Sequence, residues 1–133
     1  MILGIGTDVV EVARIEQKVR TRQGFSQLVF SAHEMAYCQM LTHPFESYAA
    51  RFAAKEAFLK AMGTGLQGTH SLNEIEVKNE ISGKPCLMLS PLLQEKVKAI
   101  FGVPHFRLHV SLSHTSQMAT AFVIIESDSN ELA

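Results

Sequence analysis

The sequence lacks the features that mark a membrane, secreted or nucleic-acid-binding protein. The apolar run at its N-terminus, MILGIG, is too short to span a bilayer, and no signal peptide is visible. Twelve Lys and Arg against 13 Asp and Glu give a net charge of −1, so neither a nucleic-acid nor a membrane partner is expected. The two cysteines, Cys38 and Cys86, lie far apart and form no CxxC pair, which predicts reduced thiols in a cytoplasmic protein.

The chain also lacks internal repeats, low-complexity tracts and any linker rich in proline or glycine. We therefore place no internal boundary and expect a single domain over 1–126, followed by a polar tail over 127–133. The 133 residues are 47% hydrophobic and 19% charged, which is typical of a globular chain long enough to bury a core.

Residue periodicity predicts both strands and helices. Two helix starts are marked by capping patterns: Ser31 followed by Glu34 forms a capping box, and Ser90 followed by Pro91 places proline at the first helical position. Strands are expected at 1–10, 74–78, 86–89, 106–114 and 118–126, and helices at 11–24, 31–41, 44–63 and 90–102. This order predicts an α+β fold in which a largely antiparallel sheet packs against helices.

The stretch RFAAKEAFLKAMGTG, at 51–65, departs from a plain amphipathic helix. At 100° per residue it shows an apolar stripe toward the core, two charged edges and a second apolar strip between those edges. The stripe holds Ala54, Ala57, Phe58 and Ala61, the edges are Arg51 with Lys55 and Glu56 with Lys60, and the strip is Phe52 and Leu59. A helix that packs on one side only would leave this strip exposed to water. We therefore expect Phe52 and Leu59 to meet a ligand or a neighbouring subunit.

Glu56 has two interpretations. Paired with Lys60 one turn later, it forms an i,i+4 ion pair on a solvated surface, worth about 0.3–0.5 kcal/mol. Against that, the small side chains of Ala53 and Ala57 leave the helix surface around Glu56 open. The helix then stops at GTG, where backbone can approach a ligand closely.

Asp8 is the second candidate carboxylate. Gly4 and Gly6 precede it on the same face of the first strand and leave room for another element to press close. The alternative is that Asp8 caps the helix that follows. If Asp8 and Glu56 converge, two carboxylates with positions left for water and phosphate suit Mg²⁺. Zinc is not expected, because the sequence has no HExxH and no cysteine at ligand spacing.

Four stretches in this order resemble one family: GIGTDVVEVARI, RFAAKEAFLKAMGTG, SGKP and VSLSHT. They are similar to the motifs of the holo-acyl-carrier-protein synthases, the short class of 4′-phosphopantetheinyl transferases. The likeness extends from Met1 to about Glu126, and the first two motifs are highly specific in combination. It implies the 4′-phosphopantetheinyl transferase fold, assembled as a homotrimer with active sites between protomers.

The resemblance also implies a reaction. The phosphopantetheine group of coenzyme A moves to a serine of an apo acyl carrier protein, releasing adenosine 3′,5′-bisphosphate. Fatty acid biosynthesis is the expected pathway, and the sequence does not distinguish a fatty-acid carrier from a polyketide carrier. Asp8 and Glu56 are implied to bind Mg²⁺, with Lys60 at the phosphates and Glu56 taking the serine proton directly or through a bound water. These residue types suit the task, because the pyrophosphate is anionic and a serine hydroxyl is a poor nucleophile.

Coenzyme A, the co-substrate, is implied to contact a wider set of residues. The set is Arg51, Lys60, Gly63, Thr64, Gly65, Lys84, Pro85 and His114. Arg51 and His114 are expected near phosphate groups, and the Lys84–Pro85 turn near the nucleotide, from the same or the adjacent protomer. The alternative for Lys84–Pro85 is an ordinary hairpin turn.

Carrier proteins are acidic, and the resemblance implies a basic docking surface on the first helix, at Arg14, Lys18 and Arg22. Arg14 matches the family arginine directly. The alternative is a solvated, charged helix face without a partner.

Two other functions stay open at this level. One is a coenzyme-A-binding or carrier-docking module of the same fold that does not transfer. The other is an α+β acyl-CoA thioesterase, which would not require Mg²⁺. The presence of Asp8, Glu56 and Lys60 together favours the transferase, because a docking module has no need of all three.

Overall fold

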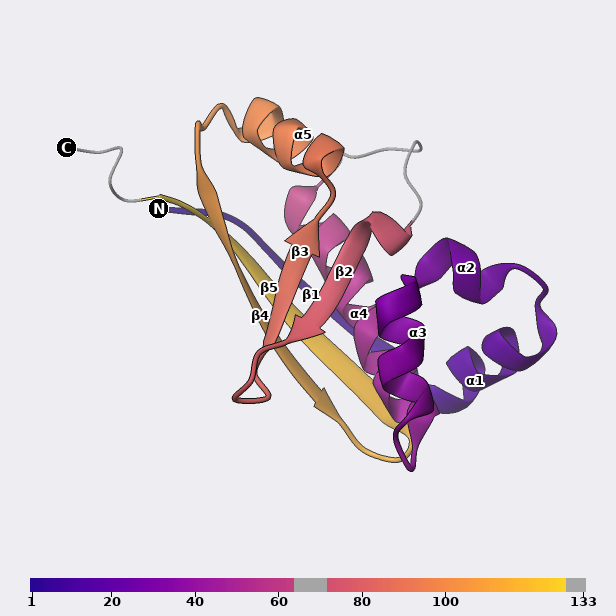
Figure 1. Ribbon diagram of the computed structural model, residues 1–133. Helices are drawn as coiled ribbons and strands as arrows, with labels where there is room; N and C mark the ends of the chain where they lie inside the picture. Colours follow the sequence, from indigo (N-terminus) through magenta and orange to yellow (C-terminus); the bar gives the residue numbers. More distant parts are fainter. Residues whose placement is uncertain (64–71, 129–133) are drawn as a thin grey trace.

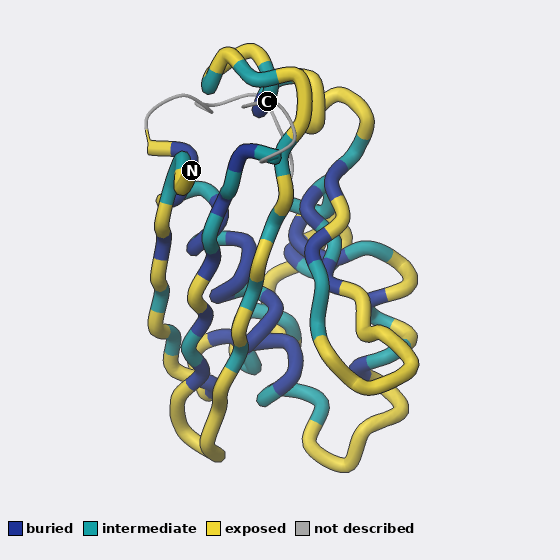
Figure 2. The backbone as a smooth tube through the Cα atoms, turned by 90° about the vertical axis from the view of Figure 1, so that its left-hand side faces the viewer, coloured by how far each residue is buried: buried dark blue, intermediate teal, exposed yellow. Residues whose placement is uncertain are grey.

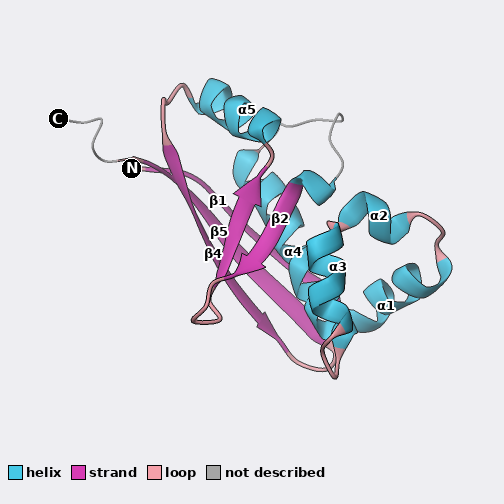
Figure 3. Ribbon diagram, viewed as in Figure 1, coloured by secondary structure: helices cyan, strands magenta, loops and turns pink. Residues whose placement is uncertain are grey.

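The computed structural model describes residues 1–63 and 72–128 (Figure 1). In chain order its elements are β1 (Ile2–Glu11), α1 (Val12–Thr21), α2 (Phe25–Val29), α3 (Ala32–Gln39), α4 (Pro44–Met62), the 3₁₀ helix η1 (Leu72–Glu74), β2 (Ile75–Asn79), β3 (Pro85–Leu89), α5 (Pro91–Phe101), β4 (Phe106–His114) and β5 (Met118–Ser127). The α+β prediction is confirmed, since helices pack against antiparallel strands (Figure 3). No helix within the described ranges is long and apolar enough to cross a membrane.

The strands form two sheets rather than one. Strands β1, β5 and β4 make a three-stranded sheet in that order, and β2 pairs with β3 as a separate hairpin. Side chains of β3 and β4, with others from α5, line a cavity of about 320 Å³. Strands β3 and β4 therefore share a cavity and are not paired by backbone hydrogen bonds.

Helix α4 packs on the inner face of the three-stranded sheet and lies at the centre of the molecule (Figures 1 and 2). The glycines of β1 permit this contact. A Cβ on Gly6 would lie 2.7 Å from the backbone nitrogen of Ala61, and a Cβ on Gly4 would meet the Ala61 carbonyl. The expected close approach beside Asp8 is thus confirmed, and α4 is the element that makes it.

One α-helix, α2, was not expected from the sequence. Helix α1 ends at Thr21, and Gly24, the predicted helix stop, instead precedes α2 with a left-handed φ of +82°. Phe25 then packs against Phe30 and Phe52, with ring centroids 6.3 and 6.4 Å away. Tertiary packing of one aromatic side chain therefore sustains a five-residue helix that periodicity could not reveal.

The two ends of the described chain meet along the sheet. Strand β5 runs through Ser127, one residue beyond the predicted end of the domain, and the Ser127 amide donates to the Met1 carbonyl at 2.9 Å.

No described helix covers the opposite face of the three-stranded sheet (Figure 2). Ile5, Val9 and Phe122 point outward there and are 55%, 57% and 43% exposed. We call these three residues and the strands around them the open sheet face.

Candidate active site

A cavity of about 280 Å³ lies where β1, α1, α4 and the start of β5 meet. Its lining includes the two predicted carboxylates and two of the predicted docking cations, with apolar side chains between them. The residues used below are Asp8, Glu56, Arg14, Lys18 and Phe52. The carboxylates, which come from β1 and α4, therefore face one space.

Asp8 is held by Lys60. Lys60 Nζ donates to Asp8 Oδ1 at 2.9 Å, and the Lys60 side chain is 57% exposed. Glu56 is not the ion-pair partner of Lys60, so the interpretation of an i,i+4 pair on a solvated surface is wrong. Asp8 is not a helix cap either, because the N-cap of α1 is Glu11 and no side chain bonds to the helix there.

Burial raises the pKa of Glu56 above its ordinary value of 4.5, and the Asp8 carboxylate raises it further. Lys60 and Lys18 act in the opposite direction. The two carboxylates thus lie close enough to repel each other. A cation between them would relieve this repulsion.

The donor set fits a hard divalent cation. The side chains that converge on this cavity offer carboxylate oxygens and neither imidazole nor thiolate, which suits Mg²⁺ better than zinc. Among the described residues no group of three or more His, Cys, Asp or Glu side chains could hold a metal ion. Two protein ligands with the remaining positions left to water and phosphate are the arrangement that Mg²⁺ commonly takes.

The predicted coenzyme A residues Arg51, Pro85 and His114 gather at a second cavity of about 240 Å³. Arg51 is only 4% exposed, and its Nε has no hydrogen-bond partner in the described structure. His114 Nδ1 lies 3.1 Å from Oε1 of Glu46. A buried cation with an unused donor beside an open cavity is a suitable site for an anion.

The two cavities have no lining residue in common, so a single chain presents its predicted site residues in two groups. Lys84 belongs to the turn of the β2–β3 hairpin, where its carbonyl accepts from the Glu80 amide at 2.8 Å. Gly63 ends α4 with φ +69°. The predicted contacts at Thr64 and Gly65 lie outside the described residues.

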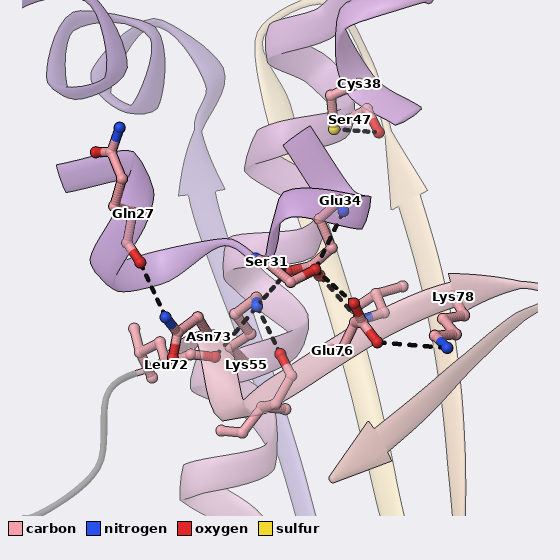
Figure 4. Close-up of polar contacts among 12 residues, drawn as sticks. Gln27, Ser31, Glu34, Cys38, Ser47, Lys55, Leu72, Asn73, Glu76 and Lys78 are labelled. Atoms are coloured by element: carbon pink, nitrogen blue, oxygen red, sulfur yellow. Dashed lines mark hydrogen bonds and ion pairs between the residues drawn. The ribbon is translucent and has the colours of Figure 1, made fainter. Parts of the chain in front are cut away.

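The prediction of a charged edge at Arg51 and Lys55 is wrong, because both side chains are buried. Lys55 is fully buried, and its Nζ donates to Oε1 of Glu34 at 2.7 Å and to the carbonyls of Leu72 and Ile75 (Figure 4). Oε2 of Glu34 accepts from the Val77 amide at 2.8 Å. Burial lowers the pKa of Lys55, while Glu34 opposes that shift. This cluster fixes α4 against α3 and β2, and with it the direction in which Glu56 points.

The second apolar strip, expected to meet a ligand or a neighbouring subunit, has partners within the chain. Phe52 packs against Phe25 of α2 and lines the carboxylate cavity, whereas Leu59 packs against the main hydrophobic core. Helix α4 is covered on more than one side, so both residues find partners within the chain.

The predicted docking cations lie on α1. Arg14 and Lys18 line the carboxylate cavity, and Lys18 Nζ also lies 5.8 Å from the centre of the Phe25 ring. Arg22 is the exposed C-cap residue of α1. Two of the three cations therefore adjoin Asp8 and Glu56.

Comparison with known proteins gives consistent results. Residues 4–121 match the family model of the 4′-phosphopantetheinyl transferase superfamily. A holo-[acyl-carrier-protein] synthase of Cytophaga hutchinsonii is 46% identical over 125 residues, which is 93% of this chain and 97% of that protein. Among solved structures, the Neisseria meningitidis holo-[acyl-carrier-protein] synthase aligns with a TM-score of 0.80 at 35% identity, covering 96% of this chain and 100% of that one. The Bacillus anthracis synthase, solved in complex with CoA (3′,5′-ADP), aligns with a TM-score of 0.77 at 35% identity over 96% of this chain and 99% of that one.

Proposed function

The chain belongs to the 4′-phosphopantetheinyl transferase superfamily, and we infer that it transfers the 4′-phosphopantetheine group of coenzyme A to a serine of an apo acyl carrier protein. This is the activity of a holo-[acyl-carrier-protein] synthase. The observation that carries the inference is the convergence of Asp8 from β1 and Glu56 from α4 on one cavity. The relatives supply the substrates, since they are named for the carrier protein and one was solved with coenzyme A.

Asp8 and Glu56 would hold Mg²⁺. When bound, the ion supplies positive charge that offsets the negative charge developing on the pyrophosphate oxygens. Lys60 already contacts Asp8 and is more than half exposed, so its flexible side chain can extend from Asp8 to a phosphate of the co-substrate.

Glu56 is our candidate for the base. The serine oxygen forms a bond to the phosphorus next to pantetheine, and the bond from that phosphorus to the bridging oxygen breaks. Adenosine 3′,5′-bisphosphate leaves with the bridging oxygen, and the carboxylate of Glu56 accepts the serine proton. The position of Glu56 in the lining of the carboxylate cavity supports this role.

Coenzyme A would contact both cavities through different copies of the chain. The Arg51 cavity and the Asp8 cavity are separate on one chain, and the open sheet face offers apolar surface for self-association. We therefore propose a homotrimer in which each active site combines the two cavities from neighbouring protomers. Sedimentation equilibrium should give three chain masses, and a stable monomer with full activity would contradict this assembly.

Arg14, Lys18 and Arg22 would receive the acidic carrier protein at the rim of the carboxylate cavity. We assign the carrier to fatty acid biosynthesis, in keeping with the acyl carrier protein for which the relatives are named. Both cysteines are free thiols, which supports a reducing, cytoplasmic setting.

Mass spectrometry tests the function directly. The protein is mixed with apo carrier protein, coenzyme A and Mg²⁺, and the carrier is then weighed, with a chelator-treated sample as control. Covalent gain of phosphopantetheine only when Mg²⁺ is present supports the transferase. Complex formation without mass gain would instead identify a docking module, and hydrolysis of added acyl-CoA a thioesterase.

A further inference from the structure

A single side chain, that of Asn79, ties the β2–β3 turn to Arg51. Asn79 ends β2, and its Oδ1 accepts a hydrogen bond from Nη2 of Arg51 at 2.7 Å. Its Nδ2 donates to the Gly83 carbonyl at 3.0 Å. Only this orientation of the amide satisfies both partners, because Arg51 can only donate and the carbonyl can only accept.

The other two groups that contact the Arg51 guanidinium are also neutral. Nη1 donates to the Ser47 hydroxyl at 2.7 Å, and the guanidinium lies 4.4 Å from the centre of the Tyr37 ring. Within residues 1–63 and 72–128, no carboxylate forms an ion pair with Arg51. A cation that is 4% exposed thus keeps its full charge and has one donor, Nε, without a partner.

An uncompensated buried charge is costly, and proteins usually pair it with a counter-ion. Aspartate at position 79 could accept the same hydrogen bond and cancel the charge. Asparagine gives the same geometry and leaves the charge available. The cavity beside Arg51, which Pro85 and His114 also line, is where an anion would meet it.

We infer that Asn79 is a positioning residue that fixes Arg51 against the hairpin turn while leaving its positive charge free for a phosphate group of coenzyme A. The inference rests on the proposed function, since it takes the co-substrate as the anion. It adds a residue whose proposed role is exerted through Arg51, beside the same cavity that Asn79 itself lines. It also explains why position 79 carries an amide rather than a carboxylate.

The test compares Asn79→Asp with Asn79→Ala. The aspartate keeps the acceptor for Arg51, loses the donor to Gly83 and adds a negative charge, whereas alanine removes both hydrogen bonds and adds no charge. Binding of adenosine 3′,5′-bisphosphate is measured by calorimetry, KM for coenzyme A and kcat by steady-state kinetics, and folding by thermal melting. Asn73→Asp, in η1, makes the same chemical change away from this cavity and serves as the matched control.

We expect Asn79→Asp to weaken nucleotide binding and raise KM for coenzyme A by tenfold or more. The loss should exceed that of Asn79→Ala, although Asn79→Asp melts at or above the wild-type temperature. The carrier-protein KM and the Asn73→Asp variant should stay within twofold of wild type. Nucleotide binding by Asn79→Asp within twofold of wild type, or weaker binding by Asn79→Ala than by Asn79→Asp, would overturn the inference and leave the proposed function standing. If the wild type transfers nothing and binds no nucleotide, both fail.

Discussion

Two lysines five residues apart on α4 each bind a carboxylate, at nearly the same distance and in opposite surroundings. Lys55 lies 2.7 Å from Glu34, and both side chains are 0% exposed. Lys60 lies 2.9 Å from Asp8, with 57% and 14% of the side chains exposed. Distance alone would assign these two pairs the same role.

The difference lies in what each pair leaves unsatisfied. The Lys55 ammonium has three acceptors, and both oxygens of Glu34 accept hydrogen bonds, so the buried pair is complete. The exposed pair, Lys60 with Asp8, adjoins Glu56, a second carboxylate whose pKa is raised, and Asp8 lines the carboxylate cavity. A complete pair stabilises the fold, whereas an incomplete pair beside space can bind something else.

Breaking the buried pair should have the largest effect. Lys55→Met leaves the Glu34 carboxylate buried without its cation and should reduce the free energy of unfolding by about 3–5 kcal/mol, measured by urea denaturation. The double variant Lys55→Met with Glu34→Gln removes both charges and should recover much of that loss. A loss below about 1 kcal/mol in the single variant would show that the buried pair does not stabilise α4.

Breaking the exposed pair of Lys60 and Asp8 should change activity rather than stability. Lys60→Met removes an exposed ion pair, so the free energy of unfolding should change by less than about 1 kcal/mol. Lys60 is the proposed donor to a phosphate of coenzyme A, so its replacement should lower kcat/KM for coenzyme A by about 10–100-fold. Lys60→Arg retains the charge and should recover part of the activity. Full activity in Lys60→Met would remove Lys60 from the site.

Charge reversal at the rim of the carboxylate cavity should weaken binding of the carrier protein. Arg14→Glu should raise the carrier-protein KM roughly tenfold at low salt, and less at high salt, while KM for coenzyme A stays near wild type. Lys98→Glu on α5 reverses a charge far along the chain and is the control. Equal effects of the two variants would mean that only net charge matters.

Removing the charge of Glu56 should have the smallest of these effects, a small change in the free energy of unfolding. The raised pKa means that the folded state holds the proton more tightly than the unfolded chain. This contribution is complete below pH 4.5 and is lost as pH rises through the raised pKa. Glu56→Gln is neutral at every pH, so without metal it should exceed wild type at pH 7 by less than about 1 kcal/mol and match it near pH 4. A variant less stable than wild type at pH 7 would contradict the repulsion between Glu56 and Asp8.

Local signals predicted local structure well. The capping box at Ser31 and Glu34, the N-cap at Ser90 and the helix end at Gly102 all occur as expected. Gly4 and Gly6 correctly predicted a close approach to β1. Each of these features depends on a few neighbouring residues, so the sequence contains the information directly.

Features that depend on distant partners were not predicted. The helical projection assumed that one side of α4 is covered, but α4 is packed on several sides, and Arg51 and Lys55 are therefore buried rather than at an edge. The position of both cations beside the apolar Phe58 was the available signal. No local pattern shows that Glu34 reaches Lys55, or that Asn79 reaches Arg51, because those partners are 21 and 28 residues apart.

The shared cation site is tested most directly by calorimetric titration of Mg²⁺ into the coenzyme A complex of wild type, Asp8→Asn and Glu56→Gln. The account predicts one ion per chain in wild type and binding at least about tenfold weaker in either variant, since each carboxylate supplies a ligand to the same ion. Wild-type affinity in either variant would show that the two carboxylates do not bind one ion together.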